Sequence, residues 1–199
     1  MKYLELSNNM INKKFVEQLK KDYKDQESER RQIISLSNNV LFHSKKAIFA
    51  LHRNEIKIAD AKLKEMEDSL LQLEKKFGIK RINEEGAYRA AIEEYVEAKL
   101  LSFVIKGEKI DRIKKLKLGN DAYLGGICDL LGELVRKATN EAAAGNFDQV
   151  EKIKKLSNDI MDQLIDFDMT GYLRTKYDQA RGHLRKLEQM AYEIKLRTK

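Results

Sequence analysis

The chain has 199 residues and a net charge of +7, and 42% of its residues are hydrophobic, which excludes a disordered chain. Its one cysteine, Cys128, excludes an intrachain disulfide and a cysteine-rich zinc site. No stretch approaches the ~20 apolar residues of a membrane span, and residues 1–6 lack a signal-peptide core. We therefore expect a cytoplasmic protein, and the positive charge is compatible with a nucleic-acid partner or simply with solubility.

The first predicted helix covers residues 12–53. The sequence contains no proline, the residue that most strongly breaks helices. Apolar residues recur at three- and four-residue spacing from Phe15 to Leu51, which is the helical period. The stretch 20–31 is almost wholly polar, and we interpret it as a solvated overhang, a frayed end or a surface for a partner.

Five further helices are predicted downstream. They cover residues 55–77, 83–105, 120–144, 147–166 and 169–197. Gly78 stands where a C-cap glycine belongs, and Asn83 is expected to cap the third helix. Residues 106–119 form a basic connector, and no segment shows strand alternation. The sequence predicts an all-α fold, a single-domain antiparallel bundle of six or seven long helices over residues 1–199.

Two pairs of acidic residues stand where apolar residues are expected. Glu94 and Glu97 lie about 60° apart on a face of the third helix that is otherwise alanine and leucine. Asp129 and Glu133 share a face of the fourth helix. Buried carboxylates must share a proton, pair with cations or bind metal. Oxygen ligands of this kind suit Mg²⁺ or Mn²⁺, and salt bridges to lysines of neighbouring helices are the alternative.

Glycines accompany the second acidic pair. Gly125, Gly126 and Gly132 lie in the interior of the predicted fourth helix, where each costs roughly 1 kcal/mol relative to alanine. We interpret the missing side chains as room for a close helix, a metal or a substrate backbone.

The histidines and the cysteine indicate no zinc chemistry. None of His43, His52 and His183 belongs to an HExxH or Glu-x-x-His motif, so a zinc hydrolase or di-iron site is not expected. Each histidine is expected on the surface or partly buried. Cys128 points about 100° away from its neighbour Asp129 and is expected in the core.

Two segments resemble the translin/Trax family. Residues 92–98, Ile-Glu-Glu-Tyr-Val-Glu-Ala, resemble Leu-Gln-Glu-Tyr-Val-Glu-Ala of Trax-type members. Residues 123–134, Tyr-Leu-Gly-Gly-Ile-Cys-Asp-Leu-Leu-Gly-Glu-Leu, resemble their Tyr-Leu-x-Gly-Val-Ala-Asp-Leu-x-Gly-Glu-Leu segment. Residues 50–53 and the last predicted helix are also similar, so the resemblance covers most of the chain from Ser35 onward.

The resemblance implies a curved all-α fold that assembles into hollow, roughly octameric shells. Trax-type members are endoribonucleases that use a divalent ion, Mg²⁺ or Mn²⁺, and their catalytic, metal-holding acids match Glu94, Glu97, Asp129 and Glu133. Translin proper binds single-stranded RNA and DNA with little or no catalysis and lacks the full acidic set. This chain is shorter between the third and fourth helices, as in compact archaeal members, so a homo-oligomer is expected and a translin-like paralogue in the shell stays open.

Basic residues near the acids are the candidates for RNA contact, and a flexible, solvated charge run is the alternative for the connector. The candidates are His52, Arg53, Lys57, Lys106, Arg112, Lys114, Lys115 and Lys117. Three functions compete: an RNA endonuclease, a translin-like binder with idle acids, and a helical scaffold with its acids in salt bridges.

Apolar residues on the predicted fifth helix and just beyond it indicate surplus surface to bury in a homo-oligomer, unless the subunit uses them in its own core. They are Phe147, Ile153, Leu156, Ile160, Leu164 and Phe167.

Overall fold

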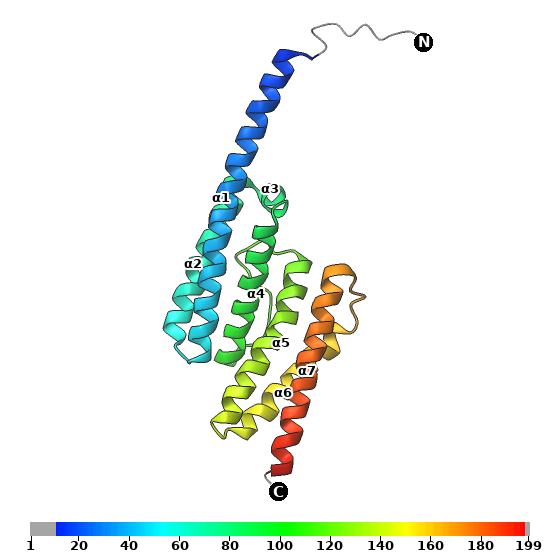
Figure 1. Ribbon diagram of the computed structural model, residues 1–199. Helices are drawn as coiled ribbons and strands as arrows, with labels where there is room; N and C mark the ends of the chain where they lie inside the picture. The colour runs from blue at the N-terminus through cyan, green and yellow to red at the C-terminus, as the bar shows by residue number, and fades with distance from the viewer. Residues whose placement is uncertain (1–10, 198–199) are drawn as a thin grey trace, which may run out of the picture.

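The computed structural model describes residues 11–197, and this part of the chain forms seven helices and no strand (Figure 1). The helices are α1 (Lys13–His52), α2 (Ile56–Phe77), α3 (Ile79–Asn83), α4 (Gly86–Lys106), α5 (Asn120–Ala143), α6 (Phe147–Leu164) and α7 (Gly171–Arg197). The predicted all-α fold is confirmed. Apart from the start of α4, the helix ends lie within two residues of the predicted ones.

The exception is the start of α4, where the prediction that Asn83 caps the helix is wrong. Asn83 is the last residue of the short α3, and its amide Nδ2 donates to the carbonyl of Ile79 at 2.8 Å. Gly78, at φ 77°, ends α2. The fully buried Ile82 packs α3 against the core. The chain therefore makes a short extra helix before α4 begins at Gly86.

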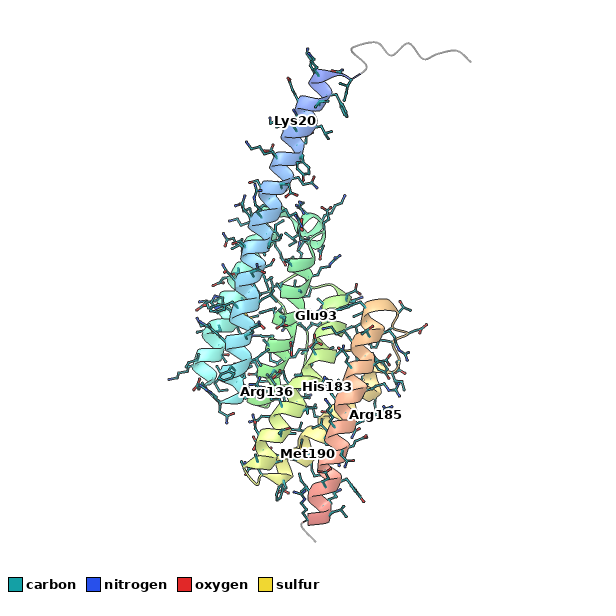
Figure 2. All side chains as sticks on the ribbon, in the orientation of Figure 1. Lys20, Glu93, Arg136, His183, Arg185 and Met190 are labelled. Carbon is teal, nitrogen blue, oxygen red and sulfur yellow. The ribbon has the colours of Figure 1, made fainter. Side chains whose placement is uncertain are left out.

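The first half of α1 extends past the rest of the bundle (Figures 1 and 2). Asn12 caps this helix, since its Oδ1 accepts from the backbone N–H groups of Lys14 and Phe15 at 3.0 and 3.3 Å. Residues 17–26 are all exposed, and Ile33 is the first buried residue of the helix. The polar stretch is thus a solvated helical overhang.

The bundle consists of two groups of helices that meet where α4 packs against α5. On one side α1 packs against α2 and α4, and on the other α5 packs against α6 and α7. Buried apolar residues from Ile33 to Leu187 form one continuous core. Among the described helices, none combines the length and apolar character that a membrane span requires. Because α4 lies at the centre, most of its faces are buried, and its acidic residues cannot all reach bulk water.

Two glycines allow α4 and α5 to approach closely. A Cβ at Gly126 would lie 2.6 Å from Val96 Cγ1 and 3.1 Å from the Glu93 carbonyl oxygen, and one at Gly125 would lie 2.2 Å from Glu93 Oε2. Close packing of a helix, one of the reasons considered for glycine here, is therefore confirmed for Gly125 and Gly126.

We predict that Gly126→Ala lowers the free energy of unfolding by about 1–3 kcal/mol, because the new methyl group forces Val96 and the α4 backbone apart. Gly182→Ala is the matched control in α7, since a Cβ there would meet nothing within 4 Å. Higher helix propensity should stabilise this control by roughly 0.5–1 kcal/mol. Urea unfolding of both variants measures the difference, and equal stabilisation would contradict close packing at Gly126.

Candidate active site

The α4–α5 contact gathers the four acids that the sequence singled out. Burial, and then the carboxylates of Glu94, Asp129 and Glu133, raise the pKa of Glu97 to about 9. Glu97 is 8% exposed, and no described residue donates a hydrogen bond to it or forms an ion pair with it. Glu97 is therefore a buried, protonated acid at neutral pH, surrounded by other acids.

A fifth acid, Glu93, belongs to the same cluster. Lys176 of α7 reaches between two helices, with its Nζ 2.6 Å from Glu93 Oε1 and 2.5 Å from Asp129 Oδ2. The hydroxyl of Tyr172, one turn earlier on α7, donates to Glu93 Oε1 at 2.7 Å. Although desolvation opposes it, these partners raise the pKa of Lys176, so the ammonium stays charged.

Sequence reasoning missed Glu93, Tyr172 and Lys176. Glu93 adjoins Glu94 and was not singled out, because the close approach of α5 is what buries it. Tyr172 and Lys176 lie 79 and 47 residues from their partners Glu93 and Asp129. Their four-residue spacing places both on one face of α7, but nothing local shows which helix that face meets.

At the other end of the cluster, α1 holds two acids in place. Ser44, which is fully buried, donates its hydroxyl to Glu94 Oε2 at 2.6 Å. His52 Nε2 forms a hydrogen bond with Glu133 Oε2, and Arg136 lies 3.5 Å from the same oxygen. Burial alone would raise the pKa of Glu133, but the His52 and Arg136 contacts outweigh it and lower that pKa.

His52 is thus a correction to the predicted RNA contacts. Its side chain is only 4% exposed, because the end of α1 packs it against Glu133. It orients a carboxylate, so it is not exposed for the RNA contact that the sequence predicted. The other two histidines are partly buried, as expected. His43 Nδ1 lies 3.0 Å from Glu65 Oε2, and His183 Nε2 would lie 3.3 Å from a Cβ at Gly132.

Two further titratable groups lie beside the cluster. Cys128 is buried, which confirms its place in the core, and burial raises the pKa of its thiol to about 12, so the thiol stays protonated at neutral pH. For His183, burial and then the nearby Lys186 lower the pKa, which favours the neutral imidazole. The carboxylates therefore carry the negative charge of this site.

The charges of the cluster suit a cation, although the side chains as placed do not surround one. Within residues 11–197, no three histidine, cysteine, aspartate or glutamate side chains are arranged to hold a metal ion. The ammonium of Lys176 lies between Glu93 and Asp129 instead. Burial raises the pKa of Asp129 even so, because Lys176 only partly offsets the desolvation and the repulsion by Glu93.

The lysines of the basic connector, residues 106–119, do not all lie near the acids. Lys115 Nζ lies 2.6 Å from Glu67 Oε1, and the hydroxyl of Tyr95 donates to the other oxygen of Glu67. Tyr95 points to roughly the opposite side of α4 from Glu93 and Glu97, so Lys115 is not near the acids.

Lys117 alone of the connector lysines lines a hollow that also contains Glu93 and Tyr172 and has a volume of about 750 Å³. Among the other predicted RNA contacts, Lys106 pairs with Asp60 at 2.6 Å. The rest, Arg53, Lys57, Arg112 and Lys114, are exposed.

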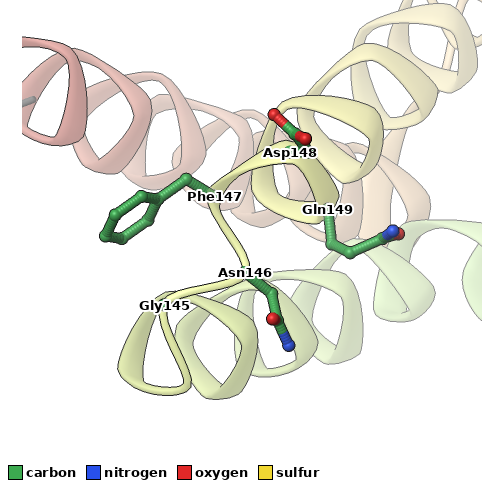
Figure 3. Close-up of a pocket in the computed structure, with 5 residues that line it drawn as sticks. All are labelled: Gly145, Asn146, Phe147, Asp148 and Gln149. Carbon is green, nitrogen blue, oxygen red and sulfur yellow. The ribbon is translucent and has the colours of Figure 1, made fainter.

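Another hollow, of about 530 Å³, lies beside the turn between α5 and α6 (Figure 3). It is lined by Gly145, Asn146, Phe147, Asp148 and Gln149. Asp148 is the one titratable side chain among these, so this hollow offers no comparable set of groups.

Comparison with known proteins agrees with this fold. A sequence profile of the Translin family matches residues 28–198. The chain belongs to the Translin family. It is 27% identical over 173 residues to an uncharacterized protein of Methanocaldococcus jannaschii, an alignment that covers 81% of this chain and 74% of the relative. It is also 28% identical to translin of Gallus gallus over 95 residues, which cover 47% of this chain and 41% of that protein.

Solved structures of the C3PO type have the same fold. The apo structure of NeC3PO superposes with a TM-score of 0.79 at 26% identity and covers 92% of this chain and 97% of its own. AfC3PO superposes with a TM-score of 0.82 at 25% identity and covers 91% and 97%. A complex of AfC3PO with duplex RNA has a TM-score of 0.75 at 24% identity and covers 91% and 96%.

The raised pKa of Glu97 predicts an unusual pH dependence of stability in the presence of a chelator. Between the ordinary value of 4.5 and about 9, the folded protein keeps a proton that the unfolded chain releases. This group therefore lowers the free energy of unfolding as pH rises through that range, and below it the effect is absent. Glu97→Gln, which stays neutral, should be more stable than wild type by roughly 2–4 kcal/mol at pH 8 and equal to it near pH 4.

Thermal or urea unfolding at the two pH values measures this difference. Glu188→Gln on the exposed side of α7 is the control, and it should differ from wild type at neither pH. A Glu97→Gln variant with the same offset at both pH values would show that the carboxyl does not titrate as described.

Proposed function

We propose that this protein binds RNA and cleaves it as a divalent-ion-dependent endoribonuclease, with Glu94, Glu97, Asp129 and Glu133 as the acids of the site. The observation that carries the proposal is Glu97, a buried carboxyl that has no cationic partner and is surrounded by carboxylates. Burying such a group is costly, and within the cluster only the charge of Lys176, which does not contact Glu97 directly, offsets part of that cost. A site that binds a cation gives a physical reason for keeping the group.

The donor set fits Mg²⁺ or Mn²⁺, because oxygen ligands with surplus negative charge are what these ions prefer. A bound ion of this kind lowers the pKa of a water molecule and stabilises charge on a phosphoryl group. Around it, Ser44 and His52 would hold Glu94 and Glu133 in fixed rotamers through the hydrogen bonds described above. Glu97 would give up its proton to solvent when the cation replaces it as the neutralising charge.

A second function, non-catalytic binding of single-stranded RNA or DNA, has one observation in its favour. Lys176 already pairs with Glu93 and Asp129 and offsets one of their two negative charges, and a site that holds an internal lysine has less need of a metal ion. The two functions differ at Glu97, which Lys176 does not contact directly and which stays unpaired in either case.

Nucleic-acid binding is supported by the complex of AfC3PO with duplex RNA and by the net charge of +7. We propose RNA with a single-stranded portion as the ligand, with single-stranded DNA as the second choice.

We also propose that the protein works as a homo-oligomer, an octamer as the family resemblance implies. The support comes from the overhang of α1, where large apolar residues repeat every four residues and are each more than half exposed. They are Ile11, Phe15, Leu19 and Tyr23. Of the apolar residues on and after α6 that the sequence suggested for this role, Ile153 and Leu164 are buried in the subunit's own core, whereas Phe147 and Phe167 are exposed. A translin-like paralogue would compete for the same overhang.

Glu97→Gln should reduce Mg²⁺-dependent cleavage of single-stranded RNA at least about 100-fold, because it removes a ligand for the ion. RNA affinity measured with a chelator should stay within about twofold, and Mg²⁺ should raise the melting temperature of wild type but not of the variant. Glu188→Gln again serves as the control. Undiminished cleavage, once contaminating nucleases are excluded, would contradict the proposed site. Asp129→Asn discriminates less well, since it also takes away a partner of Lys176.

RNA affinity should fall with salt, with a log–log slope of about 0.7 for each neutralised phosphate. Arg53→Gln should reduce this slope by roughly that amount, because the guanidinium is exposed and has no carboxylate partner among the described residues. Lys115→Gln should leave it unchanged, since Lys115 is paired with Glu67 on the far side of α4. An affinity that does not change with salt would argue against an electrostatic binding surface.

The double variant Phe15→Glu/Leu19→Glu should dissociate the oligomer, because it places two charges in the apolar stripe of the overhang. Lys21→Glu lies on the opposite side of the helix and should not. Sedimentation velocity measures the outcome. A wild-type protein that sediments only as a 23.2 kDa monomer at micromolar concentration would contradict the assembly.

A further inference from the structure

The outer side of α1 repeats a pair of residues, an exposed phenylalanine followed by a cation four residues later. Phe42 and Phe49 are 56% and 47% exposed. Lys46 Nζ lies 4.2 Å from the centre of the Phe42 ring, and Arg53 Cζ lies 4.3 Å from that of Phe49. The two rings are seven residues apart, which is two helical turns and about 10 Å along one face. We name Phe42, Lys46, Phe49 and Arg53 the aromatic–basic strip.

One end of the strip adjoins the acidic cluster. Arg136 of α5 lies 5.6 Å from the centre of the Phe49 ring and 3.5 Å from Glu133 Oε2. His52, three residues after Phe49, forms its hydrogen bond with that same oxygen. Figure 2 shows Arg136 on α5, toward the end of the bundle at which α1 finishes. A ligand lying on Phe49 would therefore be next to Glu133.

The chemistry of the strip fits a single-stranded nucleic acid. An aromatic face accepts any base by stacking, and cations beside it neutralise the phosphates of the same strand. Neither Lys46 nor Arg53 forms an ion pair with a described carboxylate. The charge of Lys46 contributes to lowering the pKa of Glu65, and both cations can still contact phosphate. Lys46 distinguishes the strip from the centre of a protein–protein interface, where lysine is depleted although phenylalanine and arginine are enriched.

We propose that the aromatic–basic strip is a nucleobase-stacking subsite, which holds a single-stranded segment of RNA beside the acidic cluster. One base stacks on Phe49 and a second, a few nucleotides away, stacks on Phe42. Lys46, Arg53 and Arg136 contact the phosphates between and beside them. The subsite rests on the proposed RNA-binding function and adds that the protein recognises exposed bases in that segment without reading their sequence.

The test uses the full chain, a chelator to prevent cleavage, and two fluorescein-labelled RNAs of about 12 nucleotides. One RNA is single-stranded with all its bases, and the other has the same backbone with abasic positions. Phe49→Leu keeps an exposed apolar side chain but removes the ring. Phe167→Leu is the matched control, since Phe167 is 52% exposed and has no described cation over its ring.

Wild type should bind the RNA with bases more tightly than the abasic RNA. Phe49→Leu should bind the RNA with bases about tenfold more weakly than wild type and the abasic RNA equally well, while Phe167→Leu changes neither. A 2-aminopurine in the RNA should be quenched by wild type and not by Phe49→Leu, which provides a measurement that does not depend on affinity.

Three results would overturn the subsite. If Phe49→Leu weakens both RNAs equally, or neither, the ring does not stack on a base. If sedimentation velocity shows that Phe49→Leu alters the oligomer, the strip is an interface between copies of this chain. If wild type binds no RNA at all, the subsite and the proposed function fail together, whereas wild-type binding without an effect of Phe49→Leu removes only the subsite.

Discussion

The contact between α4 and α5 is the constraint on which the rest of the structure depends. Gly125 and Gly126 leave no side chain between the two helices, so the backbone of α5 lies against Glu93 and Val96. This approach joins the two halves of the bundle and also removes the carboxylates of both helices from water. The same packing that closes the core therefore buries several carboxylates close together, which is unfavourable unless other groups offset their charge.

Side chains from two other helices, α1 and α7, offset part of this buried negative charge. From α1, Ser44 and His52 provide hydrogen bonds to Glu94 and Glu133, and from α7, Lys176 provides a positive charge to Glu93 and Asp129. Glu97 is left at the centre, and it stays neutral only by keeping its proton. Burial of a group in this state lowers stability above its ordinary pKa, a cost that proteins accept most often at functional sites.

The two faces of α1 have different tasks. Its inner face supplies Ser44 and His52 to the acids, while its outer face carries Phe42 and Phe49, which are about half exposed. Because a helix turns about 100° per residue, neighbours in the sequence can serve the acids and the solvent side at once. This is why Phe49, three residues before a buried histidine, is an exposed ring at the edge of the acidic cluster.

The sequence by itself determined the helices, because helical periodicity and the absence of proline are local properties. It also singled out the acids of α4 and α5 as candidates, since a carboxylate among alanines and glycines is anomalous wherever the helix packs. Only the tertiary structure decided which groups meet those acids. Lys176 and Tyr172 contact Glu93 although they are far from it in the sequence. Lys115 pairs with Glu67, and His52 is buried against Glu133. These pairings depend on how helices pack side by side, and a pattern along one helix specifies the face it presents but not the neighbour that the face will meet.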